Sequence, residues 1–221
     1  RWIAAACCAG LLLTSVLNVS ARFIDIRWVK GGRNWGDGLY EKWNALSRIY
    51  VRNTGSFPFG WGLSPAYEPK HNIEQLYLNI DSGAATVITK FDGDLGNLDH
   101  LKYDVTALAH YLRNPTSVLV IGVGGGRDIL TSLVFGQDRV VGVEINPDIL
   151  GVLTGQFSSY SGNLQENPAV TLVHDEARSY IARSAEKFGI IQASLIDTWA
   201  ATSAGAYVLT ENGLYTKEAF R

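Results

Sequence analysis

The chain has 221 residues, 47% of them hydrophobic, and a formal net charge of −2 from 19 Lys and Arg against 21 Asp and Glu. This balance, without clustered basic residues, disfavours nucleic-acid binding. The length fits one domain of ordinary size with an appendage. Two adjacent cysteines, Cys7 and Cys8, and four scattered histidines lack the spacing of metal ligands or of a disulfide, so we expect neither a metal site nor a disulfide.

The N-terminal segment is apolar. Residues 2–19 carry no charge and consist mostly of Ala, Leu, Val, Ile and Cys, and a membrane span needs ~20 such residues. Several basic residues follow, which favours a cytoplasmic location for the next part of the chain: Arg22, Arg27, Lys30 and Arg33. We therefore expect residues 1–21 to be the end of a transmembrane helix in the cell membrane. A secretory signal and a buried helix are the alternatives.

Residues 22–74 are poorly periodic and rich in Gly, Trp, Tyr and Pro, which is typical of a linker. The aromatic residues of 57–62 fit either a membrane interface or the mouth of a site. One short helix is expected where large apolar residues recur at helical spacing: Trp43, Leu46, Ile49 and Tyr50.

A β-hairpin region is predicted over residues 75–100. Two apolar runs, 76–80 and 85–89, flank Asp81-Ser82-Gly83, and this arrangement is typical of a hairpin. Apolar residues then repeat at helical spacing over 101–112, which predicts a helix leading into a larger domain at 101–221.

The glycine cluster after Ser117–Ile121 is the most informative motif. A buried strand ends in Gly122, Gly124 and Gly126, and a helical pattern follows. Glycines let the backbone turn and approach a ligand, and a helix start offers free N–H groups. A dinucleotide-binding loop would have its third glycine at position 127, which is Arg127. The spacing therefore disfavours an NAD-dependent enzyme and is typical of S-adenosylmethionine (SAM) folds.

Acidic residues follow the predicted strands. Glu144 ends the second run, at about the ~20-residue spacing after the first glycine that is expected for an acid on ribose hydroxyls. Asp175 and Glu176 follow the third run as alternatives for the adenine contact, and Asp197 follows the fourth. Strands that alternate with helices indicate a parallel sheet, and ligands bind at the carboxyl ends of its strands. We therefore expect one ligand site there.

Several of these segments resemble the spermidine synthases, which are polyamine aminopropyltransferases. Residues 118–126 look like the family's cofactor loop, and Glu176-Ala177-Arg178 looks like its Asp-Gly-Arg. Residues 211–220 look like its Glu-Ser-Leu-Tyr-Ser-x-Glu-Phe-Tyr, and Tyr103-Asp104 falls where the family has Tyr-His-Glu. The similarity runs from residue 75 to residue 220. Residues 194–202 are similar to a membrane-fused bacterial subgroup.

The resemblance implies a Rossmann-like SAM-methyltransferase fold with helices on both faces of the sheet, here truncated at the C-terminus. It implies transfer of an aminopropyl group from decarboxylated SAM to an amine, on the cytoplasmic side of the cell membrane, without a metal. Asp197 is then the candidate base or acceptor anchor. The other candidate acceptor residues are Tyr103, Asp104, Trp199 and Tyr215. A homodimer is an open expectation.

The chain also departs from this family. One of two family carboxylates after the fourth strand is missing: the pair falls on Ser194 and Asp197, or on Asp197 and Ala200. Gly125 replaces the loop acid that grips the cofactor's amino end. Asp128 is the candidate substitute, or an ordinary acid in the first turn of a helix. The stretch from Asp197 to Leu214 is longer than the family's loop, as expected either for a lid over the site or for a surface loop.

Two other functions remain open from the sequence. A SAM-dependent methyltransferase with an unknown acceptor would explain the missing carboxylate and the altered loop. A non-catalytic nucleoside-binding module of a membrane protein would bind the same cofactor without turnover.

Overall fold

The computed structural model describes residues 1–25, 27–29, 32–33, 38–55, 58–70, 72–81, 84–196, 214 and 216–218. The chain forms two compact units, Arg1–Gly36 and Asp37–Arg221. Each unit is described by itself.

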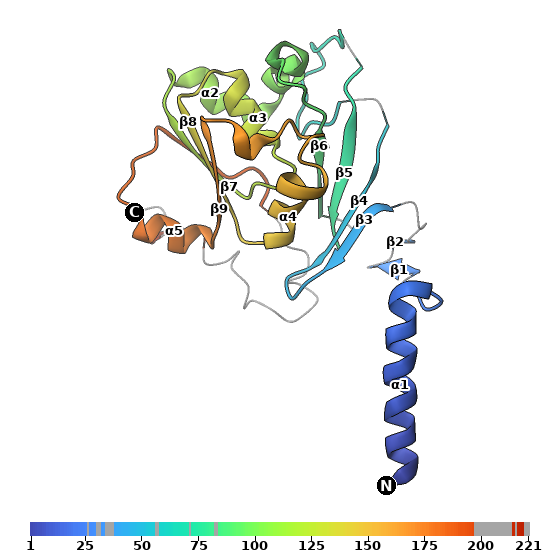
Figure 1. Ribbon diagram of the computed structural model, residues 1–221. Helices are drawn as coiled ribbons and strands as arrows, with labels where there is room; N and C mark the ends of the chain where they lie inside the picture. The colour runs from blue at the N-terminus through green and yellow to red at the C-terminus, as the bar shows by residue number, and fades with distance from the viewer. Residues whose placement is uncertain are drawn as a thin grey trace. The chain divides into compact units, whose positions relative to one another are not determined.

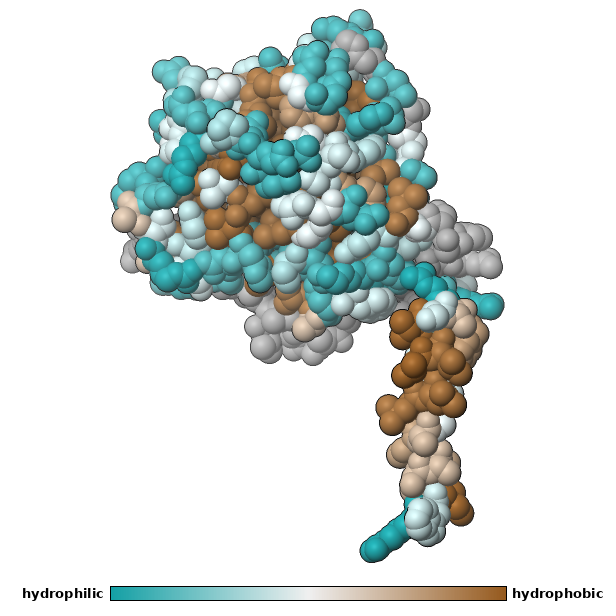
Figure 2. All heavy atoms as spheres, in the orientation of Figure 1, coloured by the Kyte–Doolittle hydropathy of each residue, from teal (hydrophilic) through white to brown (hydrophobic). Residues whose placement is uncertain are grey.

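The first unit is dominated by the helix α1 (Trp2–Ala21), whose 20 residues include no buried one. It ends at Arg22, which adopts a left-handed conformation (φ 45°) and donates its backbone N–H to the Asn18 carbonyl at 3.0 Å. A short antiparallel ribbon follows, β1 (Trp28–Val29) and β2 (Gly32–Arg33). On the visible face of α1, the strongest apolar character lies over the half nearer its C-terminal end (Figure 2). By length and composition, α1 is the one helix among the described residues that could cross a membrane.

The second unit begins with a four-stranded antiparallel sheet in the order β3-β4-β5-β6 (Figure 1). The strands are β3 (Gly38–Trp43), β4 (Arg48–Asn53), β5 (Gln75–Ile80) and β6 (Ala84–Thr89). The predicted hairpin is confirmed as β5 and β6, with Asp81 at φ 58° in the turn.

The short helix predicted from residue 43 to residue 50 is wrong, because these residues belong to β3, β4 and their connection. Four consecutive residues of β4, from Arg48 to Val51, are buried. A strand that is buried on both faces lacks the alternation of polar and apolar residues that identifies strands in a sequence. The spacing of its apolar residues was therefore mistaken for a helical one.

The segment that follows the hairpin is helical but broken. It comprises two 3₁₀ segments, Leu95–Tyr103 and Val105–Ala107, and the helix α2 (Leu108–Leu112). Asp104 interrupts the predicted continuous helix, because its carboxylate accepts from the Thr106 backbone N–H at 3.0 Å and so caps a new helical start.

The parallel sheet has the order β10-β7-β8-β9, and its three neighbouring pairs are all parallel. Its strands are β7 (Ser117–Ile121), β8 (Arg139–Glu144), β9 (Val170–His174) and β10 (Ile190–Gln192). The chain runs outward from β7 to β9 and then returns to the other side of β7. A switch point therefore lies between β7 and β10, where such sheets bind ligands.

Helices cover both faces of the parallel sheet. The helical segments are α3 (Arg127–Val134), α4 (Pro147–Gly151), a π-helical turn Val152–Gln156, a 3₁₀ turn Leu164–Glu166, and α5 (Ala177–Arg183). Val118 and Val120 of β7 pack with α3 and α4 on one face. Leu119 and Ile121 pack with α5 on the other. The predicted α/β, Rossmann-like fold class is confirmed.

Candidate functional site

A cavity of about 660 Å³ lies in the second unit. One part of its wall comes from the carboxyl ends of the parallel strands and the segments that follow them: Ile121, Gly122, Val123, Gly124, Arg127, Asp128, Val143, Glu144, Ile145, Ile149, Asp175, Glu176, Ala177, Ser194, Leu195 and Ile196. The other part comes from a loop and from the β5–β6 hairpin: Phe59, Trp61, Tyr77, Leu78, Ile80, Ala84, Ala85 and Thr86. Leu214 completes the described lining.

The glycine loop turns the chain sharply from β7 into α3. Gly122, Gly124 and Gly126 all adopt positive φ values, of 77°, 51° and 81°, which side chains with a Cβ rarely adopt. Gly122 and Gly124 line the cavity. Gly126 lies beneath it, where an added Cβ would come within 2.8 Å of Leu164.

Gly125 has a different reason to be glycine. An added Cβ there would overlap the carbonyl oxygen of Val87 in β6. The antiparallel sheet therefore rests directly on the glycine loop. No side chain fits at position 125, which explains why the acid that the resemblance implies there is replaced by glycine.

Glu144 ends β8 inside the cavity wall and is buried. Its carboxylate accepts from the backbone N–H groups of Asn146 at 2.9 Å and of Gly124 at 3.2 Å. Burial raises the pKa of Glu144, and these hydrogen bonds oppose that rise. Asn146 in turn caps α4 by accepting from the Asp148 N–H at 3.1 Å, as its position before Pro147 suggests. Glu144 is thus hydrogen-bonded both to the glycine loop and to the residue that caps the next helix.

Asp175 and Glu176 follow β9, and both line the cavity. Glu176 caps α5 by accepting from the N–H groups of Arg178 at 2.9 Å and Ser179 at 2.8 Å. Burial pushes its pKa upward, but these hydrogen bonds outweigh burial and hold the pKa below the usual value. Asp175 forms an ion pair with Arg183.

Arg127 is the cation of the described lining, and it is already paired. Its Nη2 lies 2.7 Å from Asp104 Oδ2, and its Nη1 donates to Thr106 Oγ1 at 2.9 Å. Both charged side chains are buried. Burial alone would raise the pKa of Asp104, but hydrogen bonds from Thr106 and the Arg127 charge hold it below the usual value. Sequence reasoning used Arg127 only to exclude a dinucleotide site and missed this pair.

The predicted acceptor residues Tyr103 and Asp104 are not among the residues that line the cavity. Asp104 meets the cavity wall through Arg127, whereas Tyr103 packs against Tyr67 with ring centroids 5.2 Å apart. The other predicted residues, Asp197, Trp199 and Tyr215, lie outside the described residues.

Aromatic side chains form much of the second wall. Phe59 and Trp61 meet edge to face with ring centroids 5.0 Å apart, and Tyr77 comes from β5. Of the two locations that the sequence left open for residues 57–62, the described Phe59 and Trp61 line the cavity. Their loop is held by Gln75 Oε1, which accepts from the Phe59 N–H at 2.8 Å.

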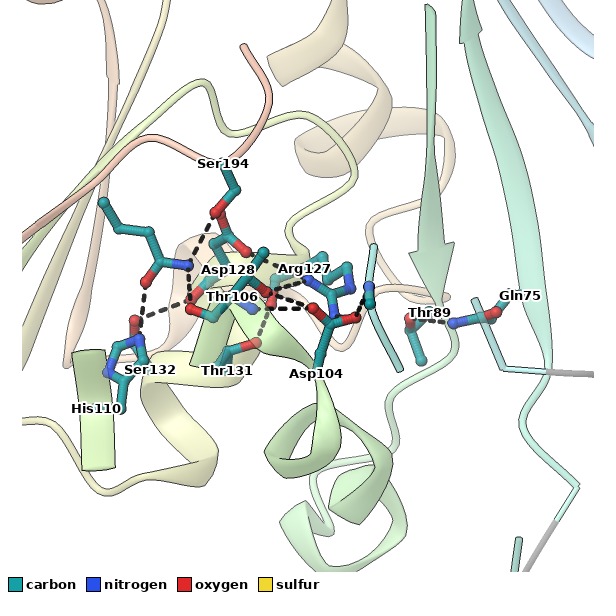
Figure 3. A network of polar contacts seen from close by, with 12 residues as sticks. Gln75, Thr89, Asp104, Thr106, His110, Arg127, Asp128, Thr131, Ser132 and Ser194 are labelled. Carbon is teal, nitrogen blue, oxygen red and sulfur yellow. Dashed lines mark hydrogen bonds and ion pairs between the residues drawn. The ribbon is translucent and has the colours of Figure 1, made fainter. Parts of the chain in front are cut away.

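A network of polar side chains lies around Asp128 (Figure 3). Gln192 of β10 and Ser194 of the segment after it lie close enough to Asp128 to oppose the rise in its pKa that burial causes. Gln192 also meets His110 of α2, with Oε1 and Nε2 2.8 Å apart. Leu195, next to Ser194, has φ 50°, an unfavourable conformation for a leucine.

The described lining carries more negative than positive charge. Its acids are Asp128, Glu144, Asp175 and Glu176, and its cation is Arg127. Since Arg127 is neutralised by Asp104, this cavity favours a ligand with positive charge.

No protein-family model and no curated protein matches the sequence. Solved structures do show similarity. A probable spermidine synthase from Corynebacterium glutamicum ATCC 13032 has 14% identity and a TM-score of 0.49, over 82% of this chain and 57% of that chain. A spermidine synthase in complex with the transition-state analogue AdoDATO has 16% identity and a TM-score of 0.46, over 72% and 48%.

Human methyltransferase-like protein 13 in complex with SAH has 24% identity and a TM-score of 0.35, over 45% of this chain and 48% of that chain. The chain thus spans about half the length of these solved structures.

Proposed function

We propose that this chain is a spermidine synthase-like transferase that moves an aminopropyl group from decarboxylated SAM to an amine acceptor. One observation carries the choice of cosubstrate: the cation of the described lining, Arg127, is already bound to Asp104 at 2.7 Å. The α-carboxylate of intact SAM would need an unpaired positive partner, because burying an unpaired charge is costly. Decarboxylated SAM carries only a sulfonium and an ammonium group, which suit a wall with four acids.

The cosubstrate contacts follow from the positions of these groups. The backbone of Gly122, Gly124 and Gly126 passes beside the nucleoside, Glu144 binds the ribose hydroxyls, and Asp175 or Glu176 binds the adenine. Because β9 and β7 are separated by β8, the adenine lies far from Asp128. The sulfonium and ammonium groups then lie near Asp128, at the switch point.

The reaction is a nucleophilic displacement. The amine nitrogen attacks the carbon bonded to the sulfonium, the C–S bond breaks, and its electron pair stays on sulfur as a neutral thioether. Catalysis comes mostly from positioning the two substrates. Asp197 serves as a base or acceptor anchor. Trp199 and Tyr215 belong to the acceptor side, and Asp104 acts there only through its ion pair with Arg127, because neither it nor Tyr103 lines the cavity.

A methyltransferase that uses intact SAM is the second candidate. It is favoured by Ser194, which lines the cavity where an ungapped comparison places the first of the family's two carboxylates. An amine acceptor with two ammonium groups needs a counter-charge for the second, and Ser194 supplies none.

Calorimetry on the full-length protein tests the proposal, with decarboxylated SAM, SAM and methylthioadenosine as ligands. Tighter binding of decarboxylated SAM, followed by aminopropyl addition to a diamine in mass spectrometry, is the expected result. Tighter binding of SAM with methyl addition would support the second candidate. Binding without any transfer would leave a non-catalytic nucleoside-binding module.

The cell membrane is the proposed location, with α1 as the anchor and the cavity on the cytoplasmic side. Fractionation of cells that express the full chain tests this. We expect the protein in the membrane fraction, and a variant with charged residues at Leu12 and Val16 in the soluble fraction. If the unchanged protein is soluble, the anchor is wrong.

A further inference from the structure

We propose that Asp128 is the proton acceptor for the attacking amine, which leaves Asp197 the role of acceptor anchor. Asp128 lies in the first turn of α3, lines the cavity, and meets Ser194 from the segment after β10. The inference rests on the proposed function, since it assigns a step to the same cavity, and it holds for either transferred group.

The position of Asp128 fits a group that acts at the reacting centre. The glycine loop and the segment after β10 flank the switch point, and Asp128 belongs to the first helical turn after that loop. The residue is only 7% exposed. Its Oδ1 atom has no hydrogen-bond partner among the described residues and lies 3.5 Å from Nη1 of Arg127. Because the residue lines the cavity, its carboxylate is a candidate to take a proton from an amine that enters there.

The side chains that lead from Gln137 to Gln192, near Asp128, form a chain of hydrogen bonds in which each donor and acceptor can be assigned. Gln137 Oε1 accepts from the Thr116 N–H at 2.9 Å, so its Nε2 must be the group that faces His110 Nδ1 at 3.2 Å. His110 Nδ1 is then an acceptor, and Nε2–H donates to Gln192 Oε1 at 2.8 Å. Burial lowers the pKa of His110, which favours the neutral ring that this arrangement requires.

The amide of Gln192 continues this chain of hydrogen bonds toward the cavity. Its Nε2 donates to Ser194 Oγ at 3.1 Å and to the Thr106 carbonyl at 3.2 Å (Figure 3). Gln192 thus holds Ser194 in place, and Ser194 lies beside Asp128 as a neutral polar group. We assign His110 and Gln192 as positioning residues, because they act on the reaction through Asp128.

The charge balance leaves Asp128 able to take a proton. Arg127 lies 3.5 Å away but is engaged more closely by Asp104, at 2.7 Å. Burial raises the pKa of Asp128, while Ser194, Arg127, Gln192 and the nearby His110 oppose the rise. A carboxylate with a raised pKa is a better base near neutral pH than an exposed one.

The step balances as follows. One proton leaves the ammonium group of the acceptor and binds to an oxygen of Asp128, which frees the nitrogen lone pair. That pair forms the new N–C bond, the C–S bond breaks, and its electrons neutralise the sulfonium. Asp128 then returns its proton to water, and the product leaves as a protonated secondary amine with a neutral thioether.

The test uses the full-length protein and measures binding of decarboxylated SAM and SAM by calorimetry, and release of the thioether nucleoside with a panel of diamines. At saturating cosubstrate, the kcat of Asp128→Asn should fall by ~10²–10⁴, and the loss of cosubstrate affinity should be smaller than the loss of kcat. Because the amine must then lose its proton to solvent, the remaining rate should rise with pH. Asp128→Glu should recover part of the rate. Asp138→Asn, the same change at an exposed turn, is the matched control and should change nothing.

His110→Phe tests the positioning network. We expect a lower kcat with unchanged cosubstrate affinity, and an altered low-pH limb of the rate profile, because the support of Asp128 is lost. Loss of stability alone would not move that limb.

Three results would overturn the inference. If Asp128→Asn turns over normally, Asp128 is not the base. If it loses cosubstrate affinity but retains kcat at saturation, Asp128 anchors the cosubstrate's ammonium group. If the unchanged protein neither binds a cosubstrate nor releases a thioether, the proposed function fails first and this inference fails with it.

Discussion

The two walls of the cavity differ in charge. All charged residues of the described lining lie on the parallel-sheet side, whereas the loop and the antiparallel hairpin contribute only aromatic, aliphatic and hydroxyl side chains. The difference follows from strand geometry. Parallel strands all end at one edge, so the polar groups of their loops gather there. The hairpin instead presents a face to the cavity.

This division suggests two tasks. The charged wall recognises a cationic nucleoside, and the uncharged wall excludes water and packs against the hydrocarbon part of a substrate. The two walls meet where Gly124 and Gly125 lie against Thr86 and Val87. Changes at this junction should affect both tasks, and changes within one wall should affect only one.

The largest effect is expected from Gly125→Ala at the junction. The new Cβ would overlap the Val87 carbonyl, so the glycine loop and β6 must separate. Overpacking of this kind costs ~1–3 kcal/mol or more, and cosubstrate binding should be lost. Urea unfolding and calorimetry measure the two effects.

Gly151→Ala is the matched control, because nothing lies within 4 Å of its added Cβ and the residue is helical. This control should stabilise the protein slightly, by ~0.5–1 kcal/mol. If Gly125→Ala and Gly151→Ala have the same stability and the same cosubstrate affinity, the two walls do not meet as described.

The helical segment Leu95–Tyr103, which follows the hairpin in the chain, should make the stability of the protein depend on pH. His100 is fully buried, and neither ring nitrogen has a hydrogen-bond partner among the described residues. Burial, and then the Arg127 charge, lower the pKa of His100 to about 4, against the smaller opposing effects of Asp99 and Asp104. Because the folded pKa lies below the unfolded value, the stabilisation is present above pH ~6.5 and is lost as pH falls toward about 4.

The expected loss of unfolding free energy over this range is up to ~3 kcal/mol. His100→Leu should remove that part of the pH dependence, which urea unfolding between these pH values would measure. Carboxylates elsewhere in the protein titrate in the same pH range. The quantity to follow is therefore the difference in unfolding free energy between the unchanged protein and His100→Leu at each pH. If the unfolding free energies of the two proteins change in parallel with pH, His100 is not the source of this pH dependence.

Sequence reasoning recovered the charged wall far better than the uncharged one. The parallel strands are continuous apolar runs, and Glu144, Asn146 and Glu176 are local signals at strand ends and helix starts. Phe59 and Trp61 lie in a loop without periodicity, so the sequence left open whether they line a site or lie at a membrane interface. The pairing of Arg127 with Asp104 depends on a tertiary contact between segments that are distant in the chain.

A test confined to the charged wall is Glu144→Gln. One of the two backbone donors, Asn146 N–H or Gly124 N–H, would then face an amide NH₂ group, and the charge for the ribose hydroxyls would be gone. Hydrogen bonds to charged groups contribute ~1.5–3 kcal/mol, so we expect at least a tenfold weaker cosubstrate affinity by calorimetry. Glu186→Gln, at an exposed ion pair with Arg139, should leave affinity unchanged. An unaltered affinity in Glu144→Gln would remove this residue from the ribose contact.

The corresponding test of the uncharged wall is Trp61→Ala, with the smallest expected effect. Trp61 is 37% exposed and packs on Phe59, so truncation removes part of the wall without opening the core. We expect the acceptor KM to rise by about tenfold, which corresponds to ~1.4 kcal/mol, while cosubstrate affinity stays constant. Trp61→Phe keeps an aromatic face and should restore most of the loss. If Trp61→Ala weakens cosubstrate binding more than acceptor binding, the two walls do not divide recognition in this way. The aromatic wall then contacts the nucleoside.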